Sequence, residues 1–142
     1  MTTSNIAASD RNLTTAPWRS VRLALAVDAT ITALNGLAYL VGADVLDELL
    51  NLNTVLLRWA GTFLMAFGLV VAALVRRPLP SRAAVWIVIG INAAWAMDSV
   101  LMGVLGWGSP SAVGTAWIIG QGVLVAGFAA WQAAALTQRT RS

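Results

Sequence analysis

The side chains that could carry chemistry in this chain are polar residues placed inside long apolar runs. They are Asp28, Asn35, Arg58, Asn92, Asp98, Gln121 and Gln132. The chain has no cysteine and no histidine, which excludes disulfides, thiol chemistry, iron–sulfur ligation and zinc sites built on these residues. No nucleophile–base pair or metal-ligand set is visible, so the sequence predicts no catalytic residues, no metal, no cofactor and no enzyme activity.

Four of these polar residues lie at a similar depth, one in each apolar run. Counted at about 1.5 Å per residue, Asn35, Arg58, Asp98 and Gln121 fall one or two helical turns from the same end of their runs. The sequence therefore predicts an outer polar cluster centred on an Arg58–Asp98 ion pair. Asn35 and Gln121 complete this cluster, and Trp95 lies beside it as packing or as the floor of a pocket.

Three interpretations of the outer cluster remain open. An unpaired arginine in the middle of a membrane span costs roughly 2.5–3.5 kcal/mol, and pairing with Asp98 removes much of that cost. The pair then either only fixes the register of the helices or forms a pocket in which Arg58 binds an anionic or zwitterionic group. In the third interpretation, Arg58 extends outward to lipid phosphate and does not pair with Asp98.

A second set, Asp28, Asn92 and Gln132, lies in the opposite, inner half of the runs. No cation lies at the level of Asp28. One hypothesis is a structural carboxyl that ties the first helix to Asn92, Thr32 or a tryptophan N–H. The other is a proton relay, because ionisable residues inside membrane spans often mark proton pathways.

The elements that must position these residues are four apolar runs, each long enough to cross a bilayer. About 20 helical residues cross the hydrocarbon layer of roughly 30 Å. The runs are residues 23–43, 55–75, 83–106 and 112–136. Charged residues make up 11% of the chain, against about 25% in soluble proteins. The sequence predicts an all-α, four-helix transmembrane bundle with membrane lipids as its neighbours.

The remaining segments are short. Residues 1–20 are polar and predict a disordered tail, 21–137 form the transmembrane domain, and 138–142 are a second tail. Between the first two runs, the acids and leucines of residues 44–50 segregate at helical spacing. We expect a short interfacial helix there, lying on the outer surface with Asp44 as its N-cap.

The arginines predict the orientation. Eight of the nine lie at one end of the runs, and the opposite loops, 44–54 and 107–111, contain no Lys or Arg. The eight are Arg11, Arg19, Arg22, Arg76, Arg77, Arg82, Arg139 and Arg141. The positive-inside rule then places both termini in the cytoplasm, as expected for a multi-pass protein of the cytoplasmic membrane. The net charge of +3 thus indicates contact with lipid headgroups and predicts no nucleic-acid partner.

Small residues predict where helices approach closely. Gly61 and Gly68 lie seven residues apart in the second run. In the fourth run, the small residues on one side are Ala116, Gly120, Gly127, Ala130 and Ala134. Such faces let helix backbones approach each other in lipid.

Two short motifs flank the interfacial segment. Gly42-Ala43-Asp44 ends the first run, and Arg58-Trp59-Ala60-Gly61 lies at the start of the second. With the polar start before the first run, this pattern over residues 20–137 resembles small four-span integral membrane proteins of actinobacteria that have no assigned activity. It is also loosely similar to DoxX-like four-helix proteins. The resemblance implies a fold and no activity.

Three functional classes remain for a protein of this kind. The first is a non-enzymatic accessory or scaffold subunit of a larger membrane complex, or a self-associating bundle that forms a homo-oligomer. The second is a protein that binds lipid or a hydrophobic small molecule, using Trp95 and the predicted Arg58–Asp98 cluster. The third is a small oligomeric proton-coupled transporter that depends on Asp28. The sequence favours the first class because of the chain's small size and its glycine- and alanine-rich helix faces.

Overall fold

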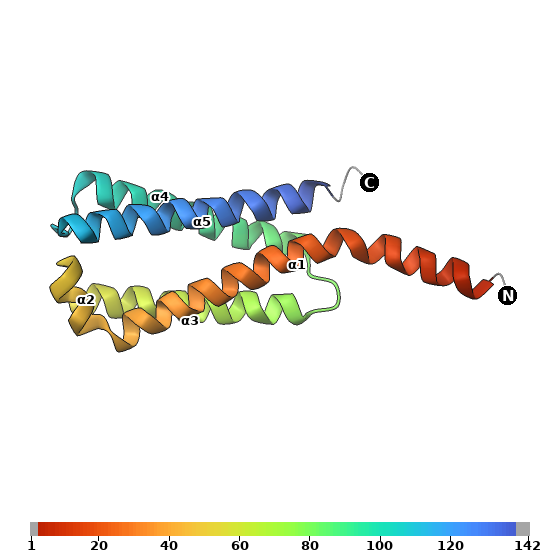
Figure 1. Cartoon of the computed structure of the whole chain (residues 1–142), viewed down its shortest axis with the longest axis horizontal. Coiled ribbons are helices and arrows are strands. Elements are labelled where there is room, and N and C mark those ends of the chain that lie inside the picture. The colour runs from red at the N-terminus through yellow and green to blue at the C-terminus, as the bar shows by residue number, and fades with distance from the viewer. Residues whose placement is uncertain (1–2, 139–142) are drawn as a thin grey trace.

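The computed structural model describes the backbone of residues 3–138 and the side chains from Trp18 to Gln138. Within this part of the chain the fold is all-α. The five helices are α1 (Thr3–Val41), α2 (Ala43–Leu50), α3 (Thr54–Arg76), α4 (Arg82–Leu105) and α5 (Ala112–Gln138). The four long helices lie side by side and α2 lies across one end of them (Figure 1). The predicted bundle with a short additional helix is confirmed.

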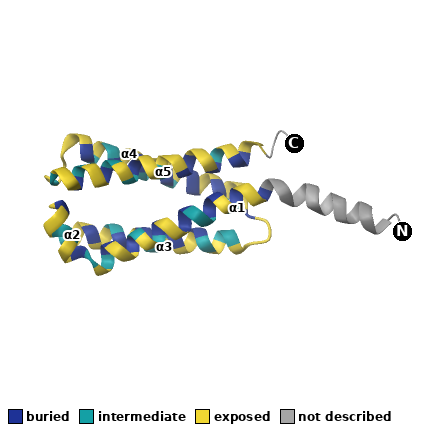
Figure 2. Cartoon of the chain, in the orientation of Figure 1, coloured by how far each residue is buried: buried dark blue, intermediate teal, exposed yellow. Residues whose placement is uncertain are grey.

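Four helical segments are long and apolar enough to cross a membrane. They are Trp18–Val41, Thr54–Arg76, Arg82–Leu105 and Ala112–Gln138, with mean hydropathies between 1.5 and 1.9. Large apolar side chains such as Leu34, Val70 and Ile87 lie exposed on the outside of these helices, and Figure 2 shows exposed residues along all of them. An apolar exterior of this extent suits lipid and not water. The protein is therefore a multi-pass membrane protein with four spans.

The four spans form two pairs. Helix α1 lies along α3, α4 lies along α5, and α1 also contacts α5 (Figure 1). Glycines bring α1 and α3 together, since a Cβ added at Gly36 would lie 2.7 Å from the Met65 nitrogen and one at Gly61 would lie 2.8 Å from the Gly36 oxygen. A Cβ at Gly68 would lie 3.0 Å from Ala33. The close approach predicted at Gly61 and Gly68 is confirmed.

The prediction for the fourth run is wrong as far as packing within this chain is concerned. Helix α5 approaches α4 through Gly122, whose added Cβ would lie 3.1 Å from the Ala96 oxygen, whereas Gly120 and Gly127 have nothing within 4 Å. Ala116, Ala130 and Ala134 are also exposed. Gly120 is two residues from Gly122, which is about 200° around a helix. The small face predicted from the sequence therefore points away from the bundle.

The first helix begins earlier than predicted. Residues 1–20 were expected to be a disordered tail, but the backbone is helical from Thr3. Once a span has formed, further residues can extend the helix without a new nucleation cost, and Pro17 is the one residue of the extension that has no backbone N–H to donate. At the other end, Gln138 is the last residue of α5, and the rest of the predicted tail 138–142 lies outside the described residues.

Helix α2 closes one end of the bundle, which we call the outer end. Its N-cap is Gly42 and not Asp44, which lies in the first turn without a side-chain capping bond. Leu50 is only 2% exposed and packs with Leu52, Leu57 and Ile118. The Ser111 N–H donates to the Leu50 carbonyl over 2.9 Å. The segment after α2 is thereby attached to the turn between α4 and α5.

The opposite end, which we call the inner end, holds the link between α3 and α4 together with the terminal ends of α1 and α5 (Figure 1). There Arg22 of α1 donates from Nη2 to the Val75 carbonyl over 2.8 Å and from Nε over 3.2 Å. The last carbonyls of a helix have no partner within it, so this arginine satisfies one at the end of α3. This bond ties α1 to α3 at the inner end, and the polar residues of the spans lie between the two ends of the bundle.

Candidate functional site

The inner polar layer is a closed network around Asp28 on α1. Its Oδ2 accepts hydrogen bonds from Asn92 Nδ2 over 2.6 Å and from Gln132 Nε2 over 2.7 Å. Its Oδ1 accepts one from Thr32 Oγ1 over 2.9 Å. Asn92 Nδ2 also lies 3.3 Å from Gln132 Oε1. The structure thus brings together Asp28, Asn92 and Gln132, the three residues of the predicted inner cluster.

This network joins the two helix pairs. Asp28 belongs to the α1–α3 pair, whereas Asn92 and Gln132 belong to α4 and α5. Asp28 and Gln132 have no exposed surface, and every donor around the carboxyl points at it. Buried polar groups are stabilising when all of them are paired in this way. The geometry supports the structural interpretation of Asp28 more than a proton relay, because a relay needs a route by which protons reach the carboxyl.

The outer polar layer is built around Gln121 on α5. Its Oε1 accepts hydrogen bonds from Asn35 Nδ2 over 3.1 Å and from Tyr39 Oη over 3.0 Å. Trp117 Nε1 donates to Tyr39 Oη over 2.7 Å. Asn35 and Gln121 therefore meet as predicted, and Tyr39 and Trp117 join them. Each of these two aromatic residues lies four residues from one of the two amides, which is the helical spacing that places them on the same face.

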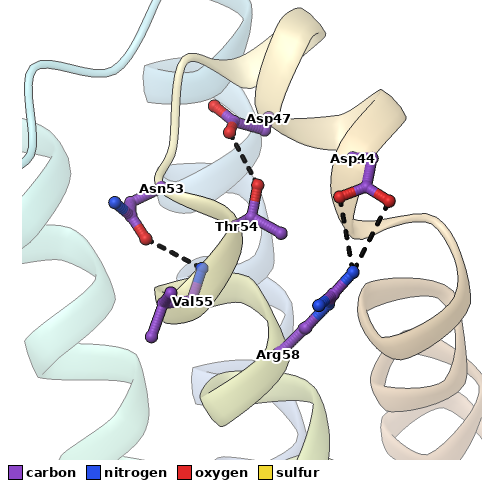
Figure 3. A network of polar contacts seen from close by, with 6 residues as sticks. All are labelled: Asp44, Asp47, Asn53, Thr54, Val55 and Arg58. Carbon is purple, nitrogen blue, oxygen red and sulfur yellow. Dashed lines mark hydrogen bonds and ion pairs between the residues drawn. The ribbon is translucent and has the colours of Figure 1, made fainter.

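The predicted Arg58–Asp98 ion pair is wrong. Arg58 Nη2 lies 3.4 Å from Asp44 Oδ1 and 3.5 Å from Oδ2, with the two side chains 57% and 80% exposed (Figure 3). Arg58 lies near the start of α3 on the side that faces α2, so its long side chain reaches outward to the first turn of that helix. Similar depth in two helices is not enough for contact, because the two side chains must also face each other.

The same outer surface holds the start of α3 in place. Asn53 Oδ1 accepts from the Val55 N–H over 2.8 Å, and Thr54 Oγ1 donates to Asp47 over 2.7 Å (Figure 3). The first bond is a side-chain N-cap, which satisfies one of the free N–H groups at the helix start. Arg58 is therefore part of a surface network that joins α2 to α3, and not of the polar layer inside the spans.

Asp98 lies apart from both layers. Its side chain is exposed, makes no hydrogen bond or ion pair with any of the described residues, and lines an open cavity of about 280 Å³ between α3 and α4. Trp95 lines the same cavity and stacks on Phe63 of α3, with ring centroids 5.5 Å apart and planes 11° apart. Of the two interpretations of Trp95, packing and the floor of a pocket, the structure supports both in part, since the half-buried ring stacks on Phe63 and lines the cavity.

The boundary between α3 and α4, which we call the seam, also contains a larger cavity toward the inner end. Its volume is about 770 Å³, and Phe63 lines both this cavity and the outer one. Its walls are apolar side chains such as Phe67, Val70 and Ile87, and Arg77 and Ser81 lie at its inner end. No sequence signal pointed to it, because an apolar cavity is made of the same residues as a packed core.

Comparison of the chain with models of protein families, with curated proteins and with solved structures gives no match. The resemblance to small four-span actinobacterial proteins therefore stays a prediction.

Proposed function

We propose that this chain is a non-enzymatic membrane protein that binds a lipid in the seam between α3 and α4. The observation that carries the proposal is the inner cavity of about 770 Å³. This volume lies within the range of roughly 300–1,000 Å³ that is usual for ligand sites. Several of the side chains that line it, including Val70, Leu79 and Ile87, are exposed on the membrane side of the bundle. A hydrocarbon chain can therefore enter sideways from the bilayer.

The charge at the inner end of the cavity indicates which lipid fits. Arg77 lines the cavity beside Ser81, and Arg76 and Arg82 flank the same link. Arginine binds phosphate groups through paired N–H donors, and serine can add a hydroxyl donor. We therefore propose an anionic phospholipid, with its phosphate at Arg77 and one acyl chain along Phe67 and Ile87.

Native mass spectrometry of the protein from mild detergent tests this proposal. We expect wild type to retain an anionic phospholipid. Ala84→Phe fills the cavity that Ala84 lines and should abolish most of the binding, and Arg77→Gln should remove the preference for anionic headgroups. Ala93→Phe is the matched control, because Ala93 is exposed on the same helix and does not line this cavity. Lipid retained equally by Ala84→Phe and wild type would overturn the proposal.

We also infer that the inner end of the bundle faces the cytoplasm. The described arginines at the inner end are Arg19, Arg22, Arg76, Arg77 and Arg82, whereas Arg58 is the sole described cation near the outer end. This asymmetry is the positive-inside pattern. Reporter fusions should therefore place Ser142 inside and Asn51 outside, and an external reporter at Ser142 would reverse the orientation.

Self-association is a second candidate, favoured by the two uncovered glycines of α5. Gly120 and Gly127 have no neighbour within 4 Å of an added Cβ, so packing within the chain does not account for them. A glycine destabilises a helix interior by about 1 kcal/mol relative to alanine, and small residues let two helices meet in lipid. If a second copy covers this face, Gly127→Leu should reduce cross-linking in native membranes, whereas Ala94→Leu on the exposed side of α4 should not. Equal cross-linking of both variants would exclude this interface.

A further inference from the structure

We propose that the outer cavity of the seam is a binding site for a monovalent organic cation, with Asp98 as its counter-charge. This inference deepens the proposed function and rests on the seam being a binding region. The cavity of about 280 Å³ lies between α3 and α4. Its wall combines one carboxylate with four aromatic rings, from Tyr39, Trp59, Phe63 and Trp95.

The charge at Asp98 has no counter-ion within the described part of the chain. Asp98 lies seven residues before Leu105, the end of α4, and is therefore about 10 Å inside the span. Ionisable side chains at such depths are usually paired or face a cavity. The one arginine in the outer half, Arg58, pairs with Asp44, and the other described arginines lie at the inner end. A cation from outside the chain is the remaining charge that can pair with this carboxylate.

The aromatic side chains indicate what kind of cation fits. A cation over an aromatic face gains about 0.5–2 kcal/mol, depending on how far it is desolvated. Three of the rings are held in place, because Trp95 stacks on Phe63 and the Tyr39 hydroxyl is bonded to Gln121 and Trp117. Such fixed walls suit a ligand with a diffuse positive charge.

The same wall disfavours a bare metal ion. Calcium takes six to eight oxygen ligands, and magnesium keeps most of its water. Here Asp98 is the one carboxylate in a largely apolar lining. A weakly hydrated organic cation, such as a quaternary ammonium group, loses little on leaving water and matches both the charge and the rings.

The size of the cavity and its depth in the membrane restrict the choice of ligand further. The cavity is close to the lower limit of about 300 Å³ for small-molecule sites, so it fits a compact cationic head. An apolar tail on that head can continue along the seam, because Phe63 borders both cavities. The depth of about 10 Å favours a free amphiphilic cation over the choline headgroup of a bilayer lipid, which lies at the membrane surface.

Equilibrium dialysis of radiolabelled tetraethylammonium against the protein in phosphatidylglycerol nanodiscs tests the inference. We expect saturable binding to wild type and a loss of affinity of about tenfold or more in Asp98→Asn, because the variant removes the paired charge. Asp98→Glu keeps the charge and should bind within about threefold of wild type. Trp59→Leu should weaken binding by about threefold through the loss of one aromatic wall.

Glu48→Gln is the matched control, since it removes an exposed carboxylate at the outer end that does not line the cavity and leaves the Arg58–Asp44 pair intact. It should bind tetraethylammonium like wild type. A repeat in phosphatidylcholine nanodiscs separates the two sources of the cation. If tetraethylammonium binds equally well in both lipids, the natural ligand is a free cation. If phosphatidylcholine weakens the binding of tetraethylammonium, the choline headgroup of the lipid occupies the same site.

Two results would overturn the inference: binding that is equal in wild type and Asp98→Asn, or no saturable binding to wild type. Asp98 makes no hydrogen bond with the described residues, so Asp98→Asn should fold normally, and its circular dichroism checks this. The lipid proposal is judged separately by Ala84→Phe. Retained phospholipid without tetraethylammonium binding would therefore reject the cation site alone.

Discussion

The inner and outer halves of the spans carry the same three side-chain types on the same three helices. The inner half has Asp28 on α1, Asn92 on α4 and Gln132 on α5, and the outer half has Asn35, Asp98 and Gln121 in that helix order. The inner set is buried and fully hydrogen-bonded, whereas Asp98 is exposed, lines a cavity and makes no hydrogen bond with the described residues. Residue type alone therefore does not decide whether a polar layer is closed or open.

The spacing along each helix explains the difference. Asp28 and Asn35 are seven residues apart, and Gln121 and Gln132 are eleven apart, so each pair stays within about 20° on one helix face. Asn92 and Asp98 are six apart, which is about 240° around α4. Asp98 is thus turned toward α3, where Trp95 and Phe63 form the cavity wall.

The largest effect is expected from removing the inner carboxyl. Asp28→Leu leaves donors on Thr32, Asn92 and Gln132 without their acceptor. Each such loss costs about 0.6–1.7 kcal/mol in a membrane, so we expect the free energy of unfolding to fall by roughly 2–4 kcal/mol. Unfolding by sodium dodecyl sulfate in mixed micelles measures this. The control Asp28→Asn keeps the shape and should lose about half as much, and wild-type stability in Asp28→Leu would show that the network contributes nothing.

A smaller loss is expected from Gln132→Leu, in the same layer. This change removes one of the three hydrogen bonds to Asp28 and leaves those from Asn92 and Thr32. The expected cost is about 1–2 kcal/mol. The double variant with Asp28→Leu should lose less unfolding free energy than the two single variants together, because both changes break the same hydrogen bond. Full additivity in a double-mutant cycle would argue against the hydrogen bond.

Gln121→Leu tests the outer layer in the same way. It removes the acceptor of Asn35 and Tyr39, but Asn35 and Gln121 are only partly buried and the buried Tyr39 keeps its bond with Trp117. Exposed donors find other partners more easily, so we expect a loss of about 0.5–1 kcal/mol, less than for Gln132→Leu. The same unfolding measurement compares them, and a larger loss for Gln121→Leu would reverse the ranking of the two layers.

Asp98→Asn should have the smallest effect on stability, within about 0.5 kcal/mol of wild type, because no contact is lost. Comparing the stability of Asp98→Asn with that of Asp28→Asn tests the difference between the two positions directly, since both changes replace a carboxyl inside a span by an amide. A marked destabilisation by Asp98→Asn, measured by the same titration, would indicate a partner for Asp98 outside the cavity.

Most of the fold follows from the sequence, because spans are recognised by length and apolarity alone. The inner cluster also follows, since its residues share depth and the helices bring them together. The true partner of Arg58 does not follow from the sequence, because the depth of a residue in a span does not fix the direction of its side chain. The position of Asp44 above Arg58 depends on how α2 folds over the end of α3. The cavities were not predictable, since they are gaps between apolar side chains whose packing no spacing rule specifies.

The long sequence separation between Asp28 and its amide partners has a consequence for the insertion of the protein into the membrane during synthesis. The amide partners of Asp28 lie 64 and 104 residues further along the chain. When α1 and α3 have entered the bilayer, the carboxyl still lacks both amide partners, and among the described residues of the first pair Thr32 is its one hydrogen-bond donor. The second pair supplies the amides, so a chain that stops after α3 carries an incompletely paired carboxyl within the membrane.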